Sequence, residues 1–393
     1  RKAFNRQFTD GKYNAFLSPL NKGAHTPVPF RVAETPIFIP DDFRNKLMEA
    51  CGDIIDAILQ PGFKQLTERA IPAKWRVANE NGHPHFLAID FGVCRDEQGA
   101  LSPKLIELQG FPSLFGFQPY VDDHYHRTFD IPAVWTSYLG TLNRQSYLDL
   151  LRRTIVGPCL PQEVVLMDVD APEQKTAVDF YLTQQELDIA VVALADLVQQ
   201  GNQLFYKTGN GSLQRIKRIY NRLIFDEIDN DPEIFKKVVD VRQPLDVEWI
   251  THPHWFYRVS KFTMPYLHGP YVPPTYFLHQ LNPIPPDLEN YVLKPLFSFA
   301  GQGVIIDVKR EDIDAITDRE NWILQQKVNY DAAIQSPEGG VKAEIRMLYL
   351  WPDGDARPTP AITLARLSRG KMIGVRYNKD LSWVGGSIAF IRQ

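Results

Sequence analysis

The sequence has few cysteines, and none of them is arranged as a metal-ligand or redox pair. Cys51, Cys94 and Cys159 lie far apart, with no C-x-x-C pair. Neither a disulfide framework nor a zinc site is therefore indicated. The first residues, RKAFNRQFTDGKYN, contain no apolar stretch of the kind that a secretory signal needs. We expect a reducing, cytoplasmic location.

Long apolar runs and an excess of one charge are also missing. No run approaches the roughly 18 apolar residues of a membrane-spanning helix, so we expect no membrane contact. Lys and Arg number 43 against 47 Asp and Glu, for a formal net charge of −4. That balance gives no reason to expect nucleic acid as a partner. Neither G-x-x-x-x-G-K-[ST] nor G-x-G-x-x-G occurs, which excludes two common phosphate-binding loops.

The length of the chain predicts more than one lobe, because 393 residues exceed a single compact core of ordinary size. Residues 1–158 are expected to form an N-terminal region, with turns over 1–40 and helices over 41–60 and 132–155. From Glu163 strands and helices alternate, which predicts a small α/β lobe over 159–245. Residues 246–393 form the third predicted lobe.

Two strand patterns in the first region bring acidic residues together. In 85–93, Leu87, Ile89 and Phe91 share one face and Asp90 lies on the other. A second strand follows over 104–109. A hairpin centred between residues 98 and 99 places Asp90 directly opposite Glu107, with their Cβ atoms roughly 5 Å apart.

Like charges at that distance destabilise a sheet unless a cation lies between them. Asp90, Glu107 and the Gln109 amide offer the hard oxygen ligands that magnesium prefers. An exposed polar face that happens to carry two acids explains the pair as well, and a different register would separate them.

The third region carries two lysines and a loop rich in small residues. Lys261 lies in a helical pattern, and Lys294 ends the strand YVLKP. The loop that follows lets backbone N–H groups approach phosphate oxygens closely, and two ammonium groups can share the charge of a triphosphate. The strand WILQQKV is a candidate inter-lobe hinge whose main chain can bind an adenine edge. The expected nucleotide contacts in the loop and hinge are Ser298, Ala300, Gly301, Gln302, Gly303, Gln325, Gln326, Lys327 and Val328.

The order of these segments resembles the ATP-grasp superfamily over about 250–393. The blocks AIDFGV and KLIELQGF are also similar in placement to the metal-binding strands of glutathionylspermidine synthase and its relatives. The resemblance implies an α/β (α+β) ATP-grasp fold, in which antiparallel sheets form a nucleotide cleft beside a smaller α/β pre-ATP-grasp lobe. It also implies ATP and two Mg²⁺ ions as cofactors, with Lys261 and Lys294 on ATP and with Asp90, Glu107 and Gln109 as metal ligands.

Three positions depart from that family. Gln109 stands where Asn is usual, Ala88 where an Arg is usual, and Tyr377 where an acid follows Arg376. The Arg at the position of Ala88 serves the thiol-bearing substrate in that family, so glutathione is not implied as a substrate here.

The predicted activity is ATP-dependent carbon–nitrogen ligation between a small-molecule carboxylate and an amine through an acyl-phosphate. Such a reaction needs positioning and charge neutralisation more than covalent help from the protein. Arg346, Arg366 and Arg376 are the candidate catalytic clamps, because a guanidinium fits carboxylate and phosphoryl oxygens; surface ion pairs explain each equally well. An ATP-binding scaffold without turnover and a phosphotransferase are the alternatives, and oligomeric state stays open.

Other polar residues are given weaker roles. Glu344 and Asn378 are alternative metal ligands. Tyr220, Asn221 and Arg222 stand at a strand end where they could line the amine pocket. Solvated loop positions are expected for the paired histidines His83, His85, His124, His126, His252 and His254.

Overall fold

The computed structural model describes residues 1–393 except 24–25, 229–237, 298–301, 371–372, 374–377 and 379, and leaves out the side chains of residues 226 and 227. Its elements form a mixed α/β fold with several antiparallel sheets, as the sequence predicted in outline.

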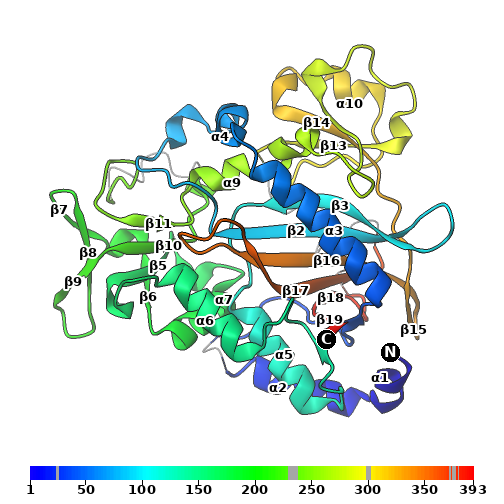
Figure 1. Cartoon of the computed structure of the whole chain (residues 1–393), viewed down its shortest axis with the longest axis horizontal. Coiled ribbons are helices and arrows are strands. Elements are labelled where there is room, and N and C mark those ends of the chain that lie inside the picture. The colour runs from blue at the N-terminus through cyan, green and yellow to red at the C-terminus, as the bar shows by residue number, and fades with distance from the viewer. Residues whose placement is uncertain (24–25, 229–237, 298–301, 371–372, 374–377, 379) are drawn as a thin grey trace.

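The largest sheet has six antiparallel strands in the order β18-β17-β16-β2-β3, with β15 paired to β16 (Figure 1). The strands are β2 (Phe86–Arg95), β3 (Leu101–Gln109), β15 (Ile334–Ser336), β16 (Gly339–Leu350), β17 (Thr359–Ser368) and β18 (Gly385–Ser387). Two of them belong to the first predicted region and four to the third, so β2 pairs with β16 although their paired residues, such as Gly92 and Glu344, are more than 250 positions apart.

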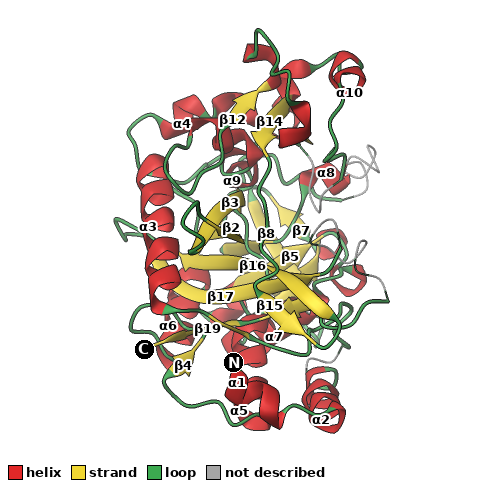
Figure 2. Cartoon of the chain, turned by 90° about the vertical axis from the view of Figure 1, so that its right-hand side faces the viewer, coloured by secondary structure: helices red, strands yellow, loops and turns green. Residues whose placement is uncertain are grey.

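The two faces of this sheet differ in what covers them. Helix α3 (Asp41–Ile58) lies across one face and packs on the odd-numbered side chains of β2, among them Leu87 and Ile89 (Figures 1 and 2). On the other face Ala88 and Leu348 pack with helix α6 (Arg144–Ile155). Farther along that second face the strands carry charged residues instead, and these form the candidate site.

A four-stranded parallel sheet of order β11-β10-β5-β6 takes three of its strands from residues 159–245, and β11 lies just beyond them. It consists of β5 (Val164–Asp168), β6 (Ala190–Ala193), β10 (Arg218–Asn221) and β11 (Glu248–Ile250), with α7 (Ala177–Leu187) between β5 and β6. A small antiparallel sheet beside it holds β7 (Val198–Gln200), β8 (Gln203–Lys207) and β9 (Leu213–Ile216), and the short helix α8 (Phe225–Ile228) follows β10. The apolar strands at Val164 and Ala190 and the helix between them match the alternation read from the sequence.

A three-stranded antiparallel sheet of order β12-β14-β13 lies above the central sheet in Figure 1. Its strands are β12 (Thr275–Phe277), β13 (Tyr291–Pro295) and β14 (Trp322–Gln326), and α10 (Arg310–Asp314) lies nearby. Leu293, Ile313 and Leu324 belong to a small core of their own. The predicted strands at YVLKP and WILQQ are therefore confirmed.

The remaining elements connect the termini to the rest of the fold. The sheet β1-β19-β4 joins β1 (Ile37–Phe38), β19 (Ala389–Arg392) and β4 (Trp135–Thr136), and α5 (Phe117–Thr128) packs beside α2 (Asp10–Leu20). The short helices α1 (Lys2–Gln7), α4 (Phe63–Leu66) and α9 (His254–Arg258) complete the α-helices of the described residues.

Two local expectations were wrong. Residues 1–40 are not all turns, because α1 and α2 form where buried Phe4 and Phe16 pack with Phe129. Tertiary packing stabilises these short helices, and local sequence does not show it. The helix expected over 132–155 begins only at Arg144, after the Asn143 side chain accepts a hydrogen bond from the Ser146 N–H and caps it.

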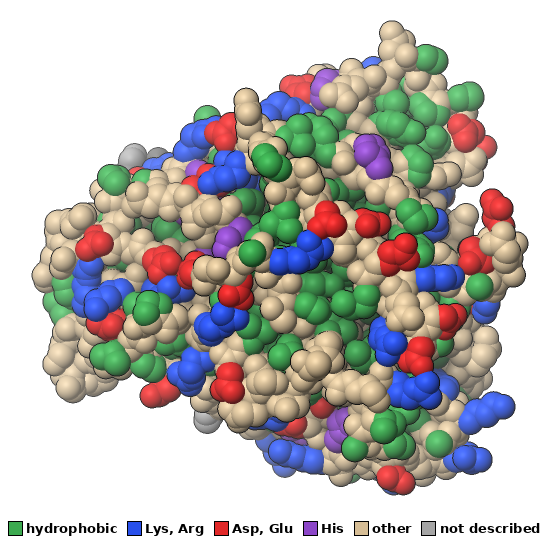
Figure 3. Space-filling model, in the orientation of Figure 1, with side chains coloured by type: hydrophobic (Ala, Val, Ile, Leu, Met, Phe, Trp, Pro, Cys, Tyr) green, Lys and Arg blue, Asp and Glu red, His purple; other side chains and the backbone are tan. Residues whose placement is uncertain are grey.

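No helix in the described part of the chain is long and apolar enough to cross a membrane. On the face shown in Figure 3, acidic and basic side chains are interspersed.

Candidate functional site

The hairpin of β2 and β3 brings Asp90 opposite Glu107, as predicted. The register that aligns these two residues differs from the predicted one. Arg95 pairs with Leu101 and Phe91 with Leu105, so the turn is centred on Gln98. An irregularity between Asp90 and Phe91 then skips Ile106, and the skip brings Glu107 into register with Asp90. A β-bulge re-aims side chains in this way and leaves one residue without a cross-strand partner.

Asp90 is almost completely buried and binds two arginines. Arg346, its cross-strand neighbour on β16, donates from Nε to Oδ1 at 2.6 Å and from Nη2 to Oδ2 at 2.7 Å. Arg366 on β17 also donates to Oδ2. Burial alone would raise the pKa of Asp90, but the charges of Arg346 and Arg366 outweigh burial and hold the pKa below its ordinary value. The carboxylate is therefore ionised and fully engaged.

Glu344, on the same strand as Arg346, also belongs to this network. It pairs with Arg366 across β16 and β17, and its Oε2 lies 2.8 Å from Arg366 Nη2. Its Oε1 accepts a hydrogen bond from the hydroxyl of Tyr330. Burial raises the pKa of Glu344, opposed in part by Arg366 and Tyr330. Sequence reasoning missed Tyr330, which no motif marks.

Lys294 reaches this network from the other sheet. Its Nζ donates to the carbonyl oxygen of Ile106 at 3.1 Å, next to Glu107. Because the bulge leaves Ile106 without a partner on β2, this carbonyl is available to a side-chain donor. Burial lowers the pKa of Lys294, and Glu107 and Glu344 oppose that shift. Lys261, at the start of a 3-10 helix (Lys261–Tyr266), donates to the carbonyl of Pro295 at 2.9 Å, so both predicted lysines meet the end of β13.

The acidic and basic side chains of the cluster are equal in number, and one end of it keeps oxygen atoms that are less engaged than the rest. Glu107 is the least engaged acid, since its side chain is 27% exposed and Arg346 Nη2 lies 3.9 Å away. Gln109 donates its amide nitrogen to Glu107 Oε1 at 3.2 Å, which leaves the amide oxygen as the atom that could bind a cation. At Asp90 a cation would have to replace Arg366. In the described residues no group of three His, Cys, Asp or Glu side chains has metal-binding geometry.

The structure shows part of the predicted nucleotide region. Ser298, Ala300, Gly301 and Arg376 lie outside the described residues, whereas Gln302 and Gly303 are exposed. In the hinge, the N–H groups of Gln326 and Lys327 donate to the carbonyls of Pro274 and Asn290 at 2.9 and 2.8 Å. Those two amides are thus satisfied within the protein. Gln325 is buried, and its side-chain nitrogen has no hydrogen-bond partner among the residues that the structure describes.

With this geometry in place, the chain can be compared with known proteins. The fold is similar to that of a glutathione synthetase-like effector. That protein, GSS30 from Globodera pallida, was solved in its apo form; it matches with a TM-score of 0.60 over 98% of each chain, at 12% sequence identity. At that identity the likeness shows the fold alone. No protein-family model matches the sequence, and no curated protein sequence does either.

A second group of polar residues lies at the carboxyl end of β10. Arg222 is buried between the rings of Phe111 and Phe180, 5.0 Å from each ring centre. Its Nε and Nη1 have no hydrogen-bond partner among the described residues, and neither has Asn221 Nδ2. Phe111 lies two residues beyond Gln109, so this group adjoins the end of β3. The carboxyl edge of a parallel sheet is where ligands bind in α/β folds.

Asn378 and the histidines have structural roles. Asn378 Oδ1 accepts hydrogen bonds from Ser368 Oγ and from the N–H groups of Arg369 and Gly370, so its oxygen is occupied. The expectation of solvated loop histidines was wrong for four of them. The four buried histidines are His85, His124, His252 and His254. They satisfy their rings within the fold, as His254 does with Glu80 at 2.9 Å, because burial requires a hydrogen-bond partner.

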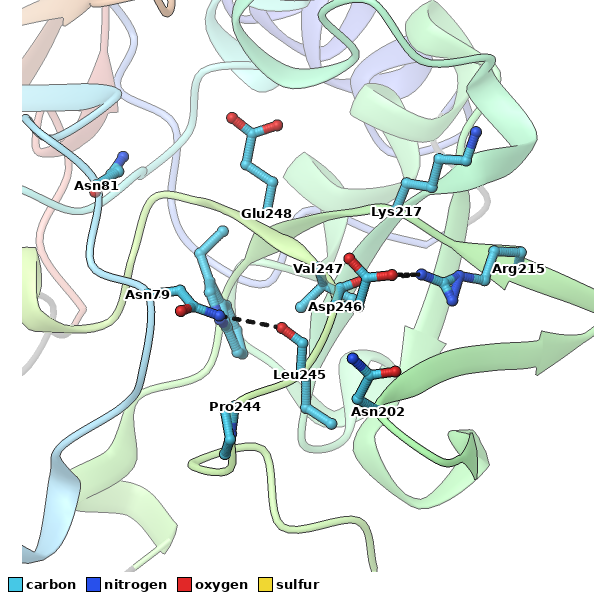
Figure 4. Close-up of a pocket in the computed structure, with 11 residues that line it drawn as sticks. Asn79, Asn81, Asn202, Arg215, Lys217, Pro244, Leu245, Asp246, Val247 and Glu248 are labelled. Carbon is cyan, nitrogen blue, oxygen red and sulfur yellow. Dashed lines mark hydrogen bonds and ion pairs between the residues drawn. The ribbon is translucent and has the colours of Figure 1, made fainter.

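An open pocket of about 710 Å³ lies elsewhere, beside β11. Figure 4 shows Arg215 paired with Asp246 and Asn79 bonded to the carbonyl of Leu245 along its wall. None of the predicted site residues lines it. It does not account for the chemistry indicated by the sequence.

Proposed function

We propose that this protein is an ATP-dependent carboxylate–amine ligase of the ATP-grasp type. One observation carries the proposal: Lys294 from the β12-β14-β13 sheet meets the acidic hairpin at Ile106, beside Glu107. The ammonium group of Lys294 and the carboxylate of Glu107, which are far apart in the sequence, thus lie close together in the fold. The description of the structural neighbour as glutathione synthetase-like supports ligation as the reaction class.

The reaction begins with attack of a carboxylate oxygen on the γ-phosphorus of ATP. The bond from that phosphorus to the bridging oxygen breaks, and ADP leaves. The amine nitrogen then attacks the acyl carbon, phosphate leaves, and the nitrogen loses a proton. Lys294 and Lys261 neutralise phosphate charge, and Arg366 holds the carboxylate. Arg346 has a different role, because both of its contacts to Asp90 fix that carboxylate within the sheet.

Magnesium would supply charge neutralisation at the phosphates. Glu107 and the Gln109 amide oxygen would hold it, since these are the least engaged oxygen donors of the cluster. Asp90 would join them only after Arg366 moves away from Oδ2. The two-ion arrangement remains part of the proposal.

The hinge strand supports a nucleotide base as ligand. Gln325 Nε2 is buried and has no partner in the described part of the chain. Such a group costs on the order of 1–3 kcal/mol unless a ligand satisfies it. An adenine nitrogen is a suitable acceptor. The Arg222 group offers a place for the second substrate, and its unpartnered guanidinium nitrogens suit an anionic or carbonyl-bearing molecule.

The test is ADP release measured with and without a panel of amines and carboxylic acids. Release that requires both substrates supports ligation. ATP binding without turnover would favour a nucleotide-binding scaffold, which the arginine-occupied Asp90 and the effector description of the neighbour make the second candidate. ADP release that needs an acceptor but no amine would indicate a phosphotransferase.

A further inference from the structure

We infer that Tyr330 is a positioning residue that fixes Arg366 for anion binding by way of Glu344. The inference rests on the proposed function only in naming the anion as a substrate carboxylate or phosphoryl group. The contacts themselves are independent of that assignment.

Tyr330 lies on the segment that leaves the hinge strand, and this segment is fastened at both ends. Lys327 N–H donates to Asn290 O at 2.8 Å, and Asp331 N–H donates to Val93 O at 2.9 Å. Arg95 Nη2 also lies 3.0 Å from the Asp331 carboxylate. Tyr330 is thereby held between β14 and the charged face of β2.

Gly92 makes room for the Tyr330 ring. A Cβ atom at Gly92 would lie 2.9 Å from Tyr330 Cε1 and 3.1 Å from Val328 Cγ1. Real Cβ atoms do not approach so closely, so any larger residue here would displace the ring. Gly92 is also the cross-strand partner of Glu344. The same pair of strands therefore sets both the ring and the carboxylate that its hydroxyl reaches.

The hydroxyl of Tyr330 completes the anchoring of Arg366. It donates to Glu344 Oε1, while Arg366 Nη2 donates to Asp90 Oδ2 and forms an ion pair with Glu344 Oε2 at 2.8 Å. A single guanidinium nitrogen is thus tied to two carboxylates. Arg366 Nε is buried and has no partner in the described part of the chain, while the side chain as a whole is 31% exposed. Arg366 is thus held through Nη2, and its other N–H groups remain for an incoming anion.

Removing the hydroxyl leaves a buried oxygen of Glu344 without its donor, and the carboxylate can then turn away from Arg366. Tyr330→Phe keeps the ring against Gly92 and removes only this bond. We expect it to weaken binding of inorganic phosphate about tenfold, as loss of a hydrogen bond to a charged group typically does. Binding of a non-hydrolysable ATP analogue through the adenine hinge should change less than twofold.

The experiment is a double-mutant cycle on phosphate affinity, measured by calorimetry with Tyr330→Phe, Arg366→Met and the double variant. If Tyr330 acts through Arg366, Tyr330→Phe has no further effect in the Arg366→Met background. The Nε–H NMR signal of Arg366, assigned as the signal lost in Arg366→Met, should shift in Tyr330→Phe. Gly92→Ala, which displaces the ring from the other strand, should reproduce both effects.

The matched control is Tyr147→Phe, which removes the hydroxyl of a buried tyrosine bonded to Phe115 O, outside this network. It should alter neither phosphate affinity nor the Arg366 signal. Wild-type phosphate affinity and an unshifted signal in Tyr330→Phe would overturn the inference, as would equal effects in the wild-type and Arg366→Met backgrounds. None of these measurements depends on ligation. A failure of the proposed function would instead be seen in the ADP-release assay, as the absence of amine-dependent ADP release.

Discussion

Arg346 binds both carboxylate oxygens of Asp90, at 2.6 and 2.7 Å, in the buried centre of the six-stranded sheet. Breaking such a pair from one side leaves an uncompensated buried charge. Asp90→Asn should therefore lower the free energy of unfolding by about 3–5 kcal/mol, measured by urea denaturation. Asp96→Asn is a suitable control, since Asp96 is a hairpin carboxylate outside the buried pair, and it should cost far less. An unchanged urea midpoint in Asp90→Asn would show that the pair is not structurally important.

Glu107→Gln separates metal binding from stability, because Glu107 is the least engaged acid of the cluster. We expect this variant to fold normally, to bind Mn²⁺ at least about tenfold more weakly by electron paramagnetic resonance titration, and to lose turnover. The Asp90→Asn, Glu107→Gln double variant should have no turnover and largely retain ATP binding. Full activity in the double variant would reject the metal assignment.

Lys294→Met should weaken ATP binding by about tenfold or more, because it removes the ammonium group beside the acidic hairpin. Fluorescent ATP-analogue titration measures the effect. The exposed Lys207 on β8 provides the control, and its change to Met should leave ATP affinity unaltered. Equal affinities in the two variants would place the triphosphate elsewhere.

Arg222→Lys keeps the positive charge beside the buried Asp179 but removes the guanidinium nitrogens that lack partners. The KM for one of the two substrates should rise about tenfold while the KM for ATP stays unchanged. Steady-state kinetics with each substrate varied in turn would show this. A matching change at exposed Arg357 should have no kinetic effect. A rise in the KM for ATP alone would contradict the assignment.

The burial of His252 should make the free energy of unfolding decrease at acidic pH. Burial, with the neighbouring His254 adding to it, lowers the pKa of His252 to about 3, against an ordinary value of about 6.5. The unfolded chain therefore binds more protons as pH falls. The contribution of His252 to stability is constant above about pH 6.5 and declines between 6.5 and about 3, by roughly 5 kcal/mol at most. Urea denaturation at several pH values measures the slope. His252→Gln should flatten it, and an unchanged slope would assign acid sensitivity to other groups such as Glu80.

The sequence predicted the elements that carry the site better than the contacts within it. The alternation in LAIDFGV gave the face of Asp90 correctly, because β2 packs its odd-numbered side chains under α3. The opposition of Asp90 and Glu107 was also correct, although the assumed turn centre was off by half a residue and a bulge compensated. The predicted lysine strand and hinge strand are present.

The partners of the arginines could not be predicted in the same way. Arg346 meets Asp90 only because β16 pairs with β2 across 256 residues of sequence, and local periodicity carries no information about that pairing. Tyr330 was missed for the same reason, since its bond to Glu344 depends on the segment after β14 running along Gly92. The histidines were placed in solvent because their pairs are flanked by residues with a loop pattern. Folding instead buries His85, His252 and His254.

Because of the bulge at Ile106, the length of the turn at the tip of the hairpin does not decide how the two acids at its base are aligned. Glu107 is aligned by the pairing of β2 with both β3 and β16, while residues 97–100 are exposed. Extra residues inserted between 97 and 100 would therefore lengthen a solvent loop without rotating the acids. A fluorophore attached there would report on the candidate site from outside it.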